Sequence, residues 1–222
     1  MRIGIIGTGN IGANCARRFV ASEKHQVRLS FSRDVHNLEA LARELGSAAS
    51  VGTPQEAAQY GEVVVFSVPW DTIPEALRQA GSLAGKIVID TTNQFGARAL
   101  PEKGQTAAEV NAERFNGCRY TKSFNTLTAG FQAKAAERPQ SERVVQWICG
   151  DDAEAKRIVA GLISDAGYVP VDLGGVKGCQ VMEAPRRNGA VYGEEYRAAD
   201  ASAVVAAVHE GRPIPPPPTY SS

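Results

Sequence analysis

Residues 2–12, with the sequence RIGIIGTGNIG, decide the fold, because a short apolar run leads into the pattern G-x-G-x-x-G and then into a helical sequence. In that context the pattern predicts a dinucleotide-binding turn. Gly7 permits the tight turn, Gly9 lets the backbone approach a pyrophosphate, and Gly12 lets the following helix pack on the strand. The other positions of the turn hold Thr8, Asn10 and Ile11.

The rest of the N-terminal half alternates short β-branched runs with helical patterns, which is typical of a parallel sheet with crossover helices. We expect strands at 2–6, 26–31, 48–51, 62–68 and 86–90, with helices at 10–21, 35–45, 54–60 and 72–80. Further strands are expected at 119–124, 144–149 and 168–173, and further helices near 106–114, 153–166, 179–183 and 195–209. The sequence therefore predicts an α/β protein with a Rossmann-type, doubly wound, mostly parallel sheet.

The C-terminal part of the sequence differs from this alternating region. Residues 1–175 form the predicted dinucleotide-binding domain, residues 176–210 a short helical extension, and residues 211–222 a proline-rich tail. The tail is expected in the polyproline II conformation, either loose or draped over a neighbouring surface.

Composition and charge limit the class of protein. The chain has 222 residues with 24 basic and 24 acidic side chains, so no net charge favours nucleic acid or an anionic membrane. Its four cysteines and three histidines lack the spacing of a metal site or a disulfide framework. The N-terminus lacks a signal-peptide pattern, and the longest apolar run, around 63–70, is too short to span a bilayer. We therefore expect a cytoplasmic protein with a small-molecule partner.

The end of the second expected strand indicates which dinucleotide is bound. NAD-binding domains carry an acidic residue about 20 positions past the glycines, where it binds the ribose 2′-hydroxyl. Here that position is Ser32, followed by Arg33, so a hydroxyl and a guanidinium replace a carboxylate that would repel a 2′-phosphate. The pair favours NADP, with Thr8 as a further hydroxyl, whereas Asp34 argues mildly against it. The alternative is that Ser32 and Arg33 form a solvated turn that caps the next helix.

Several short motifs occur in an order and spacing that resemble one family. They are Gly7-Thr8-Gly9-Asn10-Ile11-Gly12, Ser32-Arg33, Val68-Pro69-Trp70, Lys122-Ser123-Phe124-Asn125-Thr126, Cys149-Gly150-Asp151-Asp152 and Val171-Asp172-Leu173-Gly174. Over residues 1 to about 183 the chain resembles the coenzyme F420-dependent NADP oxidoreductases and the related cytosolic NADPH domain of six-transmembrane metalloreductases. The resemblance implies a Rossmann domain with a small C-terminal extension, NADP at the strand ends, and a deazaflavin or flavin stacked against the nicotinamide.

The same resemblance assigns the coenzyme site by position. Val68 and Pro69 should flank the nicotinamide and its ribose, since open α/β sheets bind ligands beyond the carboxyl ends of their strands. Asn93 and Asn125 end the next two strands, so their amides could reach the ribose, the carboxamide or the second substrate, or could instead cap turns. The 2′-phosphate site takes Thr8, Ser32 and Arg33, and the pyrophosphate turn takes Asn10 and Ile11. The full predicted site is Gly7, Thr8, Gly9, Asn10, Ile11, Gly12, Ser32, Arg33, Val68, Pro69, Asn93 and Asn125.

These features predict an NADP(H)-dependent oxidoreductase that transfers hydride between NADPH and a deazaflavin (F420), a flavin or a similar small redox partner. No catalytic side chain is expected, because the reactive atoms belong to the bound rings and the protein contributes positioning. Lys122 and Glu183 do not suggest an acid–base pair, and Lys122 is expected to face solvent. Two alternatives stay open: an NADP(H)-binding sensor or interaction module without turnover, and a small carbonyl or imine reductase.

The sequence after residue 183 departs from the apolar terminal helix of the archaeal enzymes and looks like a bacterial subgroup. Arg186 and Arg187 could bind an anionic tail of a substrate, or lie on a solvated loop. Trp70, Tyr192 and Tyr196 could form a stacking platform, although aromatic side chains near an apolar helix more often fill the core. A homodimer is a further expectation, by analogy with Rossmann proteins of this size.

The 2′-phosphate assignment predicts a change in coenzyme preference. Arg33→Ala should weaken NADPH binding much more than NADH binding, and Ser32→Asp should shift the preference towards NADH. A charge-assisted hydrogen bond contributes roughly 1.5–3 kcal/mol, which corresponds to about ten- to hundredfold in affinity. Titration calorimetry of both variants with both nucleotides measures the change. Equal losses for the two nucleotides would contradict the assignment.

Overall fold

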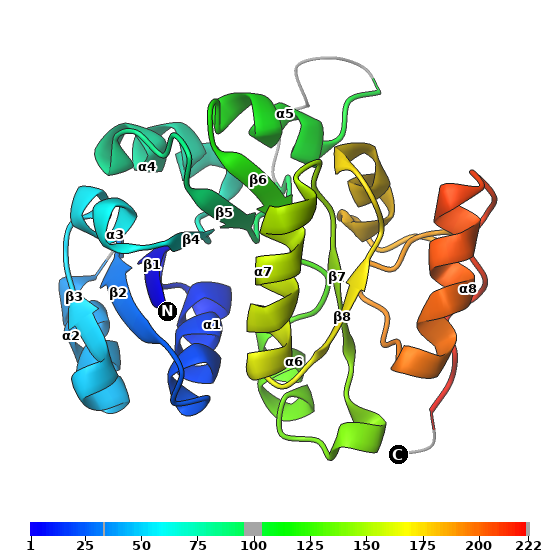
Figure 1. Ribbon diagram of the computed structural model, residues 1–222, viewed down its shortest axis with the longest axis horizontal. Helices are drawn as coiled ribbons and strands as arrows, with labels where there is room; N and C mark the ends of the chain where they lie inside the picture. Colours follow the sequence, from blue (N-terminus) through cyan, green and yellow to red (C-terminus); the bar gives the residue numbers. More distant parts are fainter. Residues whose placement is uncertain (33, 96–103, 221–222) are drawn as a thin grey trace.

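Six parallel strands form the central sheet of the protein, shown here in a computed structural model that describes residues 1–32, 34–95 and 104–220 (Figure 1). The strand order is β3-β2-β1-β4-β5-β6. Strands β2 and β3 are therefore added on one side of β1, and strands β4 to β6 on the other side, so the strand order reverses between β1 and β4. The strands are β1 (Arg2–Ile6), β2 (Gln26–Ser30), β3 (Ala49–Val51), β4 (Val63–Phe66), β5 (Ile87–Asp90) and β6 (Arg119–Lys122). This order confirms the predicted Rossmann-type, doubly wound sheet.

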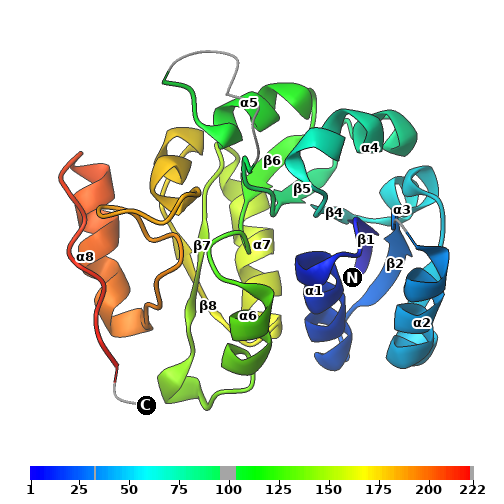
Figure 2. The same ribbon diagram turned by 180° about the vertical axis from the view of Figure 1, so that it is seen from behind.

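Helices cover both faces of the sheet, and each face has its own apolar core (Figures 1 and 2). β4 contributes alternately to the two cores: Val64 and Phe66 pack on one side, and Val63 and Val65 on the other. Burial on both faces explains why the strand reads as a continuous apolar run. The α-helices are α1 (Asn10–Ala21), α2 (Val35–Leu45), α3 (Pro54–Tyr60), α4 (Ile73–Ala80), α5 (Ala107–Arg114), α6 (Ala129–Ala135), α7 (Ala153–Asp165) and α8 (Ala198–His209). Short 3₁₀ helices span Gly46–Ala48, Trp70–Thr72, Gln140–Glu142 and Val176–Met182.

The last two strands leave the main sheet. β7 (Val145–Ile148) and β8 (Val169–Asp172) pair with each other in parallel, as a separate two-stranded sheet. Only one antiparallel bridge is described between this pair and the main sheet, where Lys122 and Cys149 exchange backbone hydrogen bonds of 2.9 and 3.1 Å. Gly150 permits this close approach, because a Cβ at that position would lie 2.6 Å from the carbonyl oxygen of Tyr120.

The structure corrects the prediction that Lys122 faces solvent: the side chain is fully buried. β6 is covered because the 3₁₀ helix Val176–Met182 packs against both β6 and α5. Sequence analysis also missed α6, a short helix that begins after Thr128, whose hydroxyl accepts a hydrogen bond from the backbone N–H of Phe131. The helix near 179–183 is a 3₁₀ helix, and α8 begins at Ala198 rather than at residue 195.

The proline-rich tail lies along α8, as Figure 1 shows at the red end of the chain. Ile214 is buried, and the Tyr220 hydroxyl accepts a hydrogen bond from the backbone N–H of Arg197 at 2.8 Å and donates one to the Asp200 carboxylate. The structure therefore has the draped arrangement rather than the loose one. Among the described residues, no helix combines the length and apolar character needed to cross a membrane.

Glu183 links the C-terminal segment, residues 176–220, to α5. Its replacement should therefore lower the stability of the protein. Its buried carboxylate accepts hydrogen bonds from the backbone N–H groups of Ala107 and Ala108, at 2.9 and 2.7 Å. Glu183→Ala leaves two buried donors unpaired, so unfolding free energy should fall by about 1–3 kcal/mol. Urea unfolding measures the change, with Glu142→Ala at an exposed position as the control. Equal stability of the two variants would contradict the capping role.

Candidate functional site

A cleft follows the carboxyl ends of the parallel strands and has two adjoining compartments. The large compartment, about 1010 Å³ in volume, includes Gly7, Thr8 and Ser32 and lies at the ends of β1 and β2. The small compartment, about 500 Å³, includes Asn93 and Asn125 and lies at the ends of β5 and β6. They meet at Gly9, Asn10, Ser67, Val68, Pro69 and Ala129. The cleft therefore spans the point where the strand order reverses, which is the ligand site of open α/β sheets.

The structure brings nearly all predicted site residues to this cleft. Gly12 is the exception among the described residues, because it lies in the buried face of α1, and Arg33 lies outside the described residues. The lining residues are Gly7, Thr8, Gly9, Asn10, Ile11, Ser32, Val68, Pro69, Asn93 and Asn125. Their roles towards a coenzyme stay predictions.

The three glycines of the turn have different surroundings. Gly7 has φ +99°, and a Cβ there would lie 2.2 Å from the carbonyl oxygen of Ser67. A Cβ at Gly12 would lie 1.9 Å from the carbonyl oxygen of Gly7, so α1 packs directly on the turn. Gly9 differs, because a Cβ there meets nothing within 4 Å. No side chain caps α1, so its first-turn N–H groups are free to bind an anion over Gly9.

Polar groups in the large compartment leave acceptors for a ligand. The Thr8 hydroxyl is buried and has no hydrogen-bond partner in the part of the chain that the structure describes. Asp34, which argued mildly against NADP, lines the large compartment and also caps α2: its carboxylate accepts from the backbone N–H of His36 at 2.9 Å and from the Asn37 amide at 3.2 Å. Phe31, just before Ser32, has φ +57°, an uncommon conformation for a bulky residue and one that often marks functional sites.

The two predicted asparagines of the small compartment bind each other. The Asn93 side chain donates to the backbone oxygen of Asn125 at 2.9 Å, and the Asn125 side chain donates to Asn93 Oδ1 at 3.1 Å and to the Met182 carbonyl at 2.7 Å. Asn125 Oδ1 is buried and has no partner within residues 1–32, 34–95 and 104–220. The sequence predicted either contacts of these amides with a ligand or capping of turns, and neither prediction described this arrangement. The two amides join the ends of β5 and β6 to the C-terminal segment, and Asn125 Oδ1 stays available as an acceptor.

Aromatic side chains surround the rest of the small compartment. Trp70, Phe95 and Tyr192 line it, and the rings of Phe95 and Tyr192 lie 6.5 Å apart between centroids. Burial raises the pKa of Tyr192, which keeps its hydroxyl protonated. Tyr196 does not join this group, because its ring packs on Trp147 in the core at 5.4 Å. The possible stacking platform therefore lacks Tyr196 and includes Phe95, which sequence analysis missed.

Arg186 and Arg187, for which an anion site was considered, do not line the cleft. Arg186 makes a two-pronged ion pair with Glu194, at 2.6 and 2.9 Å. Arg187 donates to the backbone carbonyl oxygens of Glu183 and Pro185. Neither guanidinium lines either compartment, so the structure gives no support for an anion site there.

Sequence analysis also missed polar residues that line the small compartment. Thr91 donates a hydrogen bond to the Ser67 hydroxyl at 2.9 Å and thereby joins the ends of β5 and β4. Thr92 and Thr128 also line the compartment. The available signal was the position of these hydroxyl residues after apolar strands, where the carboxyl edge of a parallel sheet binds ligands.

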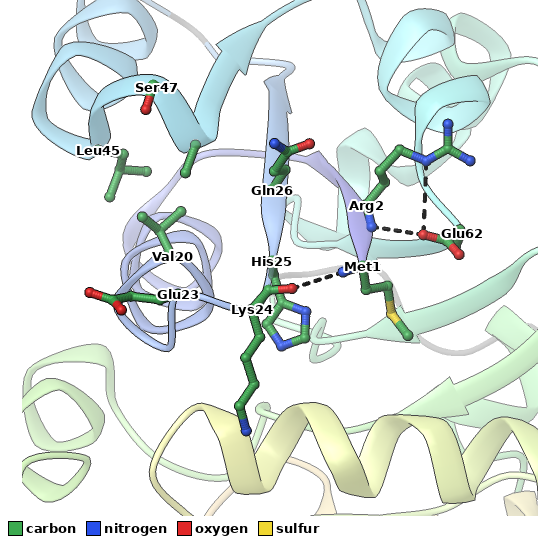
Figure 3. Close-up of a pocket in the computed structure, with 11 residues that line it drawn as sticks. Met1, Arg2, Val20, Glu23, Lys24, His25, Gln26, Leu45, Ser47 and Glu62 are labelled. Atoms are coloured by element: carbon green, nitrogen blue, oxygen red, sulfur yellow. Dashed lines mark hydrogen bonds and ion pairs between the residues drawn. The ribbon is translucent and has the colours of Figure 1, made fainter.

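A second pocket, of about 680 Å³, lies at the opposite edge of the sheet, where the strands begin (Figure 3). Met1, Gln26 and Glu62 line it, and the Met1 ammonium donates to the Lys24 carbonyl oxygen at 2.8 Å. None of the predicted site residues lies there. The amino ends of parallel strands are not the usual ligand edge of this fold, so the cleft is the candidate site.

The glycine-rich turn opens α1 beside the point where the strand order of the parallel sheet reverses. These two features define a dinucleotide-binding protein of the Rossmann class. Residues 2–94 match the family described as NADP oxidoreductase, coenzyme F420-dependent. This match places the N-terminal part of the chain, from β1 to the loop after β5, with a family of NADP-dependent oxidoreductases.

Known proteins also resemble the chain beyond residues 2–94. Metalloreductase STEAP3 of Rattus norvegicus is 31% identical over 183 residues, covering 82% of this chain and 36% of that protein. The chain thus spans about a third of the length of the curated relatives it matches. A hypothetical protein of Sinorhizobium meliloti superposes with a TM-score of 0.77 and 28% identity, over 88% of this chain and 94% of the other. A candidate F420-dependent NADP reductase of Arthrobacter sp. FB24 shares the fold, with a TM-score of 0.68 and 24% identity. The match covers 81% of this chain and 87% of the other.

The glycine surroundings predict that two similar substitutions act differently. Gly9→Val places a side chain in open space over the anion site, so it should abolish dinucleotide binding and leave the fold intact. Gly12→Val is the matched variant, because its side chain would collide with the backbone of Gly7 and should prevent folding. Circular dichroism together with NADPH titration separates the two effects. Unchanged NADPH affinity in Gly9→Val would show that the turn is only structural.

Proposed function

We propose that the cleft binds NADP(H) and that the protein transfers hydride between NADPH and a deazaflavin (F420), a flavin or a similar small redox partner in the small compartment. The observation that carries the proposal is a pair of buried acceptors that have no partner among the described residues, Thr8 Oγ1 and Asn125 Oδ1, whose residues line the large and the small compartment respectively. Buried polar atoms normally have partners, so these two atoms fit a ligand that extends through both compartments.

The residues present fit the coenzyme at three places along the cleft. The open space over Gly9 and the uncapped N-terminus of α1 suit a pyrophosphate. Thr8 and Ser32, with Arg33 from the sequence assignment, suit a 2′-phosphate at the end of β2. Asn125 Oδ1 suits an amide donor such as the nicotinamide carboxamide.

Positioning is the work assigned to the protein's own residues. When bound, NADPH supplies the hydride. Val68 and Pro69, where the two compartments meet, orient the ring that carries it. Trp70 and Tyr192 bound the space left for a second ring and exclude water from it. No side chain in this scheme acts as a nucleophile, because the reactive atoms belong to the bound rings.

The aromatic lining favours a planar redox partner over the two other functions considered. A small carbonyl or imine reductase would share the coenzyme half of the cleft, and Aspergillus terreus reductive aminase in complex with NADPH has the same fold at 20% identity, with a TM-score of 0.59. A sensor without turnover would also bind the nicotinamide end of the coenzyme in the small compartment, but it would have no use for the aromatic space beside it. The aromatic side chains Phe95 and Tyr192 therefore favour an enzyme over a sensor.

Calorimetric titration with NADPH and NADH, followed by NADPH oxidation with F420 and with FMN, tests the proposal. We expect NADPH to bind more tightly than NADH and at least one acceptor to be reduced, with Gly9→Val inactive in both assays. Selective NADPH binding without turnover of either acceptor would contradict the hydride-transfer proposal and favour the sensor. Absence of NADPH binding would contradict the coenzyme assignment itself.

A further inference from the structure

The ends of β5 and β6 carry a fully buried ion pair beneath the small compartment. Asp90 and Lys122 are neighbours in the parallel register, both side chains are completely buried, and Lys122 Nζ lies 3.3 Å from Asp90 Oδ2. Burial by itself would raise the pKa of Asp90, but Lys122 and several hydrogen bonds hold it below its usual value. Burial would likewise lower the pKa of Lys122, but Asp90 and nearby Glu183 hold it above its usual value. Both groups are therefore charged.

The ion pair holds both polar groups of the Thr92 backbone. Asp90 Oδ1 accepts a hydrogen bond from the Thr92 N–H at 2.8 Å, and Lys122 Nζ donates to the Thr92 carbonyl oxygen at 2.6 Å. Asp90 Oδ2 also accepts from the Tyr120 hydroxyl at 2.6 Å and from the Asn111 amide at 2.9 Å. The same Asn111 amide lies 3.0 Å from the Thr92 hydroxyl, so the backbone and side chain of Thr92 are both anchored.

Stability alone is a weak reason for such a pair. Desolvation of two buried charges offsets most of their attraction, and apolar replacements of similar size are often neutral or stabilising. The Asp90 and Lys122 pair specifies the conformation of the loop that follows β5, residues 91–95, because both side chains are hydrogen-bonded to the backbone of this loop. A buried ionic group with a single set of partners permits only one arrangement of that loop.

The loop held in this way forms one side of the small compartment. Thr91, Thr92 and Asn93 all line it. Thr91 is fixed to Ser67 at the end of β4, and Asn93 is fixed to Asn125 beyond β6. The ion pair itself does not line the compartment, so its influence on a ligand passes through the loop.

The geometry points to Asp90 and Lys122 as positioning residues for the nicotinamide end of the coenzyme. They hold the Thr92 peptide, and with it Thr91 and Asn93, in the binding arrangement before the ligand arrives, and they do not touch the ligand. A preorganised loop lowers the ordering cost of binding. The inference rests on the proposed function, because it assigns the nicotinamide to the small compartment.

The test compares NADPH with 2′,5′-ADP, which has the adenosine with its 2′- and 5′-phosphates but lacks the second phosphate of the pyrophosphate, the nicotinamide ribose and the nicotinamide. Asp90→Asn with Lys122→Met removes both charges together, which avoids an uncompensated buried charge. We expect this double variant to bind NADPH about tenfold more weakly than the wild type, with less than about twofold change for 2′,5′-ADP. Tyr120→Phe is the matched control, because it removes a hydrogen bond to Asp90 but none to Thr92, and it should bind both ligands like the wild type.

Three results of the titrations would overturn the inference. Unchanged NADPH affinity in the double variant would show that the loop does not need the ion pair. Equal losses for NADPH and 2′,5′-ADP would show a general structural defect instead of an effect at the nicotinamide end. Wild-type protein that binds neither ligand would contradict the proposed function, and the inference with it.

Hydrogen exchange on the wild type tests the same point even if the double variant does not fold. The Thr92 amide of the ligand-free protein should exchange as slowly as the amides within β5, since its hydrogen bond to Asp90 is buried. NADPH should then change its exchange rate little. Rapid exchange that slows only after NADPH is added would overturn the inference, because the loop would then be ordered by the ligand and not by the ion pair.

Discussion

The close contact between α1 and the turn after β1 is the constraint on which the site depends. A Cβ at Gly12 would lie 1.9 Å from the Gly7 carbonyl oxygen, so only glycine allows the helix to start where it does. This contact aims the N-terminus of α1 across the carboxyl edge of the sheet, beside Val68 and Pro69. A helix displaced by one side chain would direct its free N–H groups elsewhere, and the two compartments would no longer meet at Gly9.

A second constraint acts at the far end of the cleft, where three separate parts of the chain converge. Asn93 follows β5, Asn125 follows β6, and the Met182 carbonyl belongs to the C-terminal segment, yet the Asn125 amide contacts both others. Glu183 adds a link from the same segment to α5. The C-terminal segment thus completes a wall of the small compartment, to which it contributes Tyr192. Changes in that segment would alter the small compartment while leaving the glycine turn after β1 unchanged.

Much of the fold could be predicted because local patterns decide it. Parallel strands buried on both faces must be apolar throughout, as Val63–Phe66 are, and the glycine spacing marks the turn after β1. The strands predicted at 144–149 and 168–173 are present as β7 and β8, but they pair with each other outside the main sheet. A run of β-branched residues predicts a strand but does not predict which strand it pairs with. Helix α6 was not predicted, because its seven residues give too few turns for a clear helical period.

The sequence by itself determined the class of sheet, the glycine turn and the positions where strands end, because these follow from side-chain size, backbone freedom and hydrophobic period. Only the tertiary structure decided the surroundings of the charged and polar groups. Lys122 reads as a surface residue, but the covering 3₁₀ helix buries it beside Asp90, and Asp34 caps a helix where a phosphate was in question. A charged side chain carries no local signal of its partner, since that partner is chosen by segments distant in sequence that fold over it.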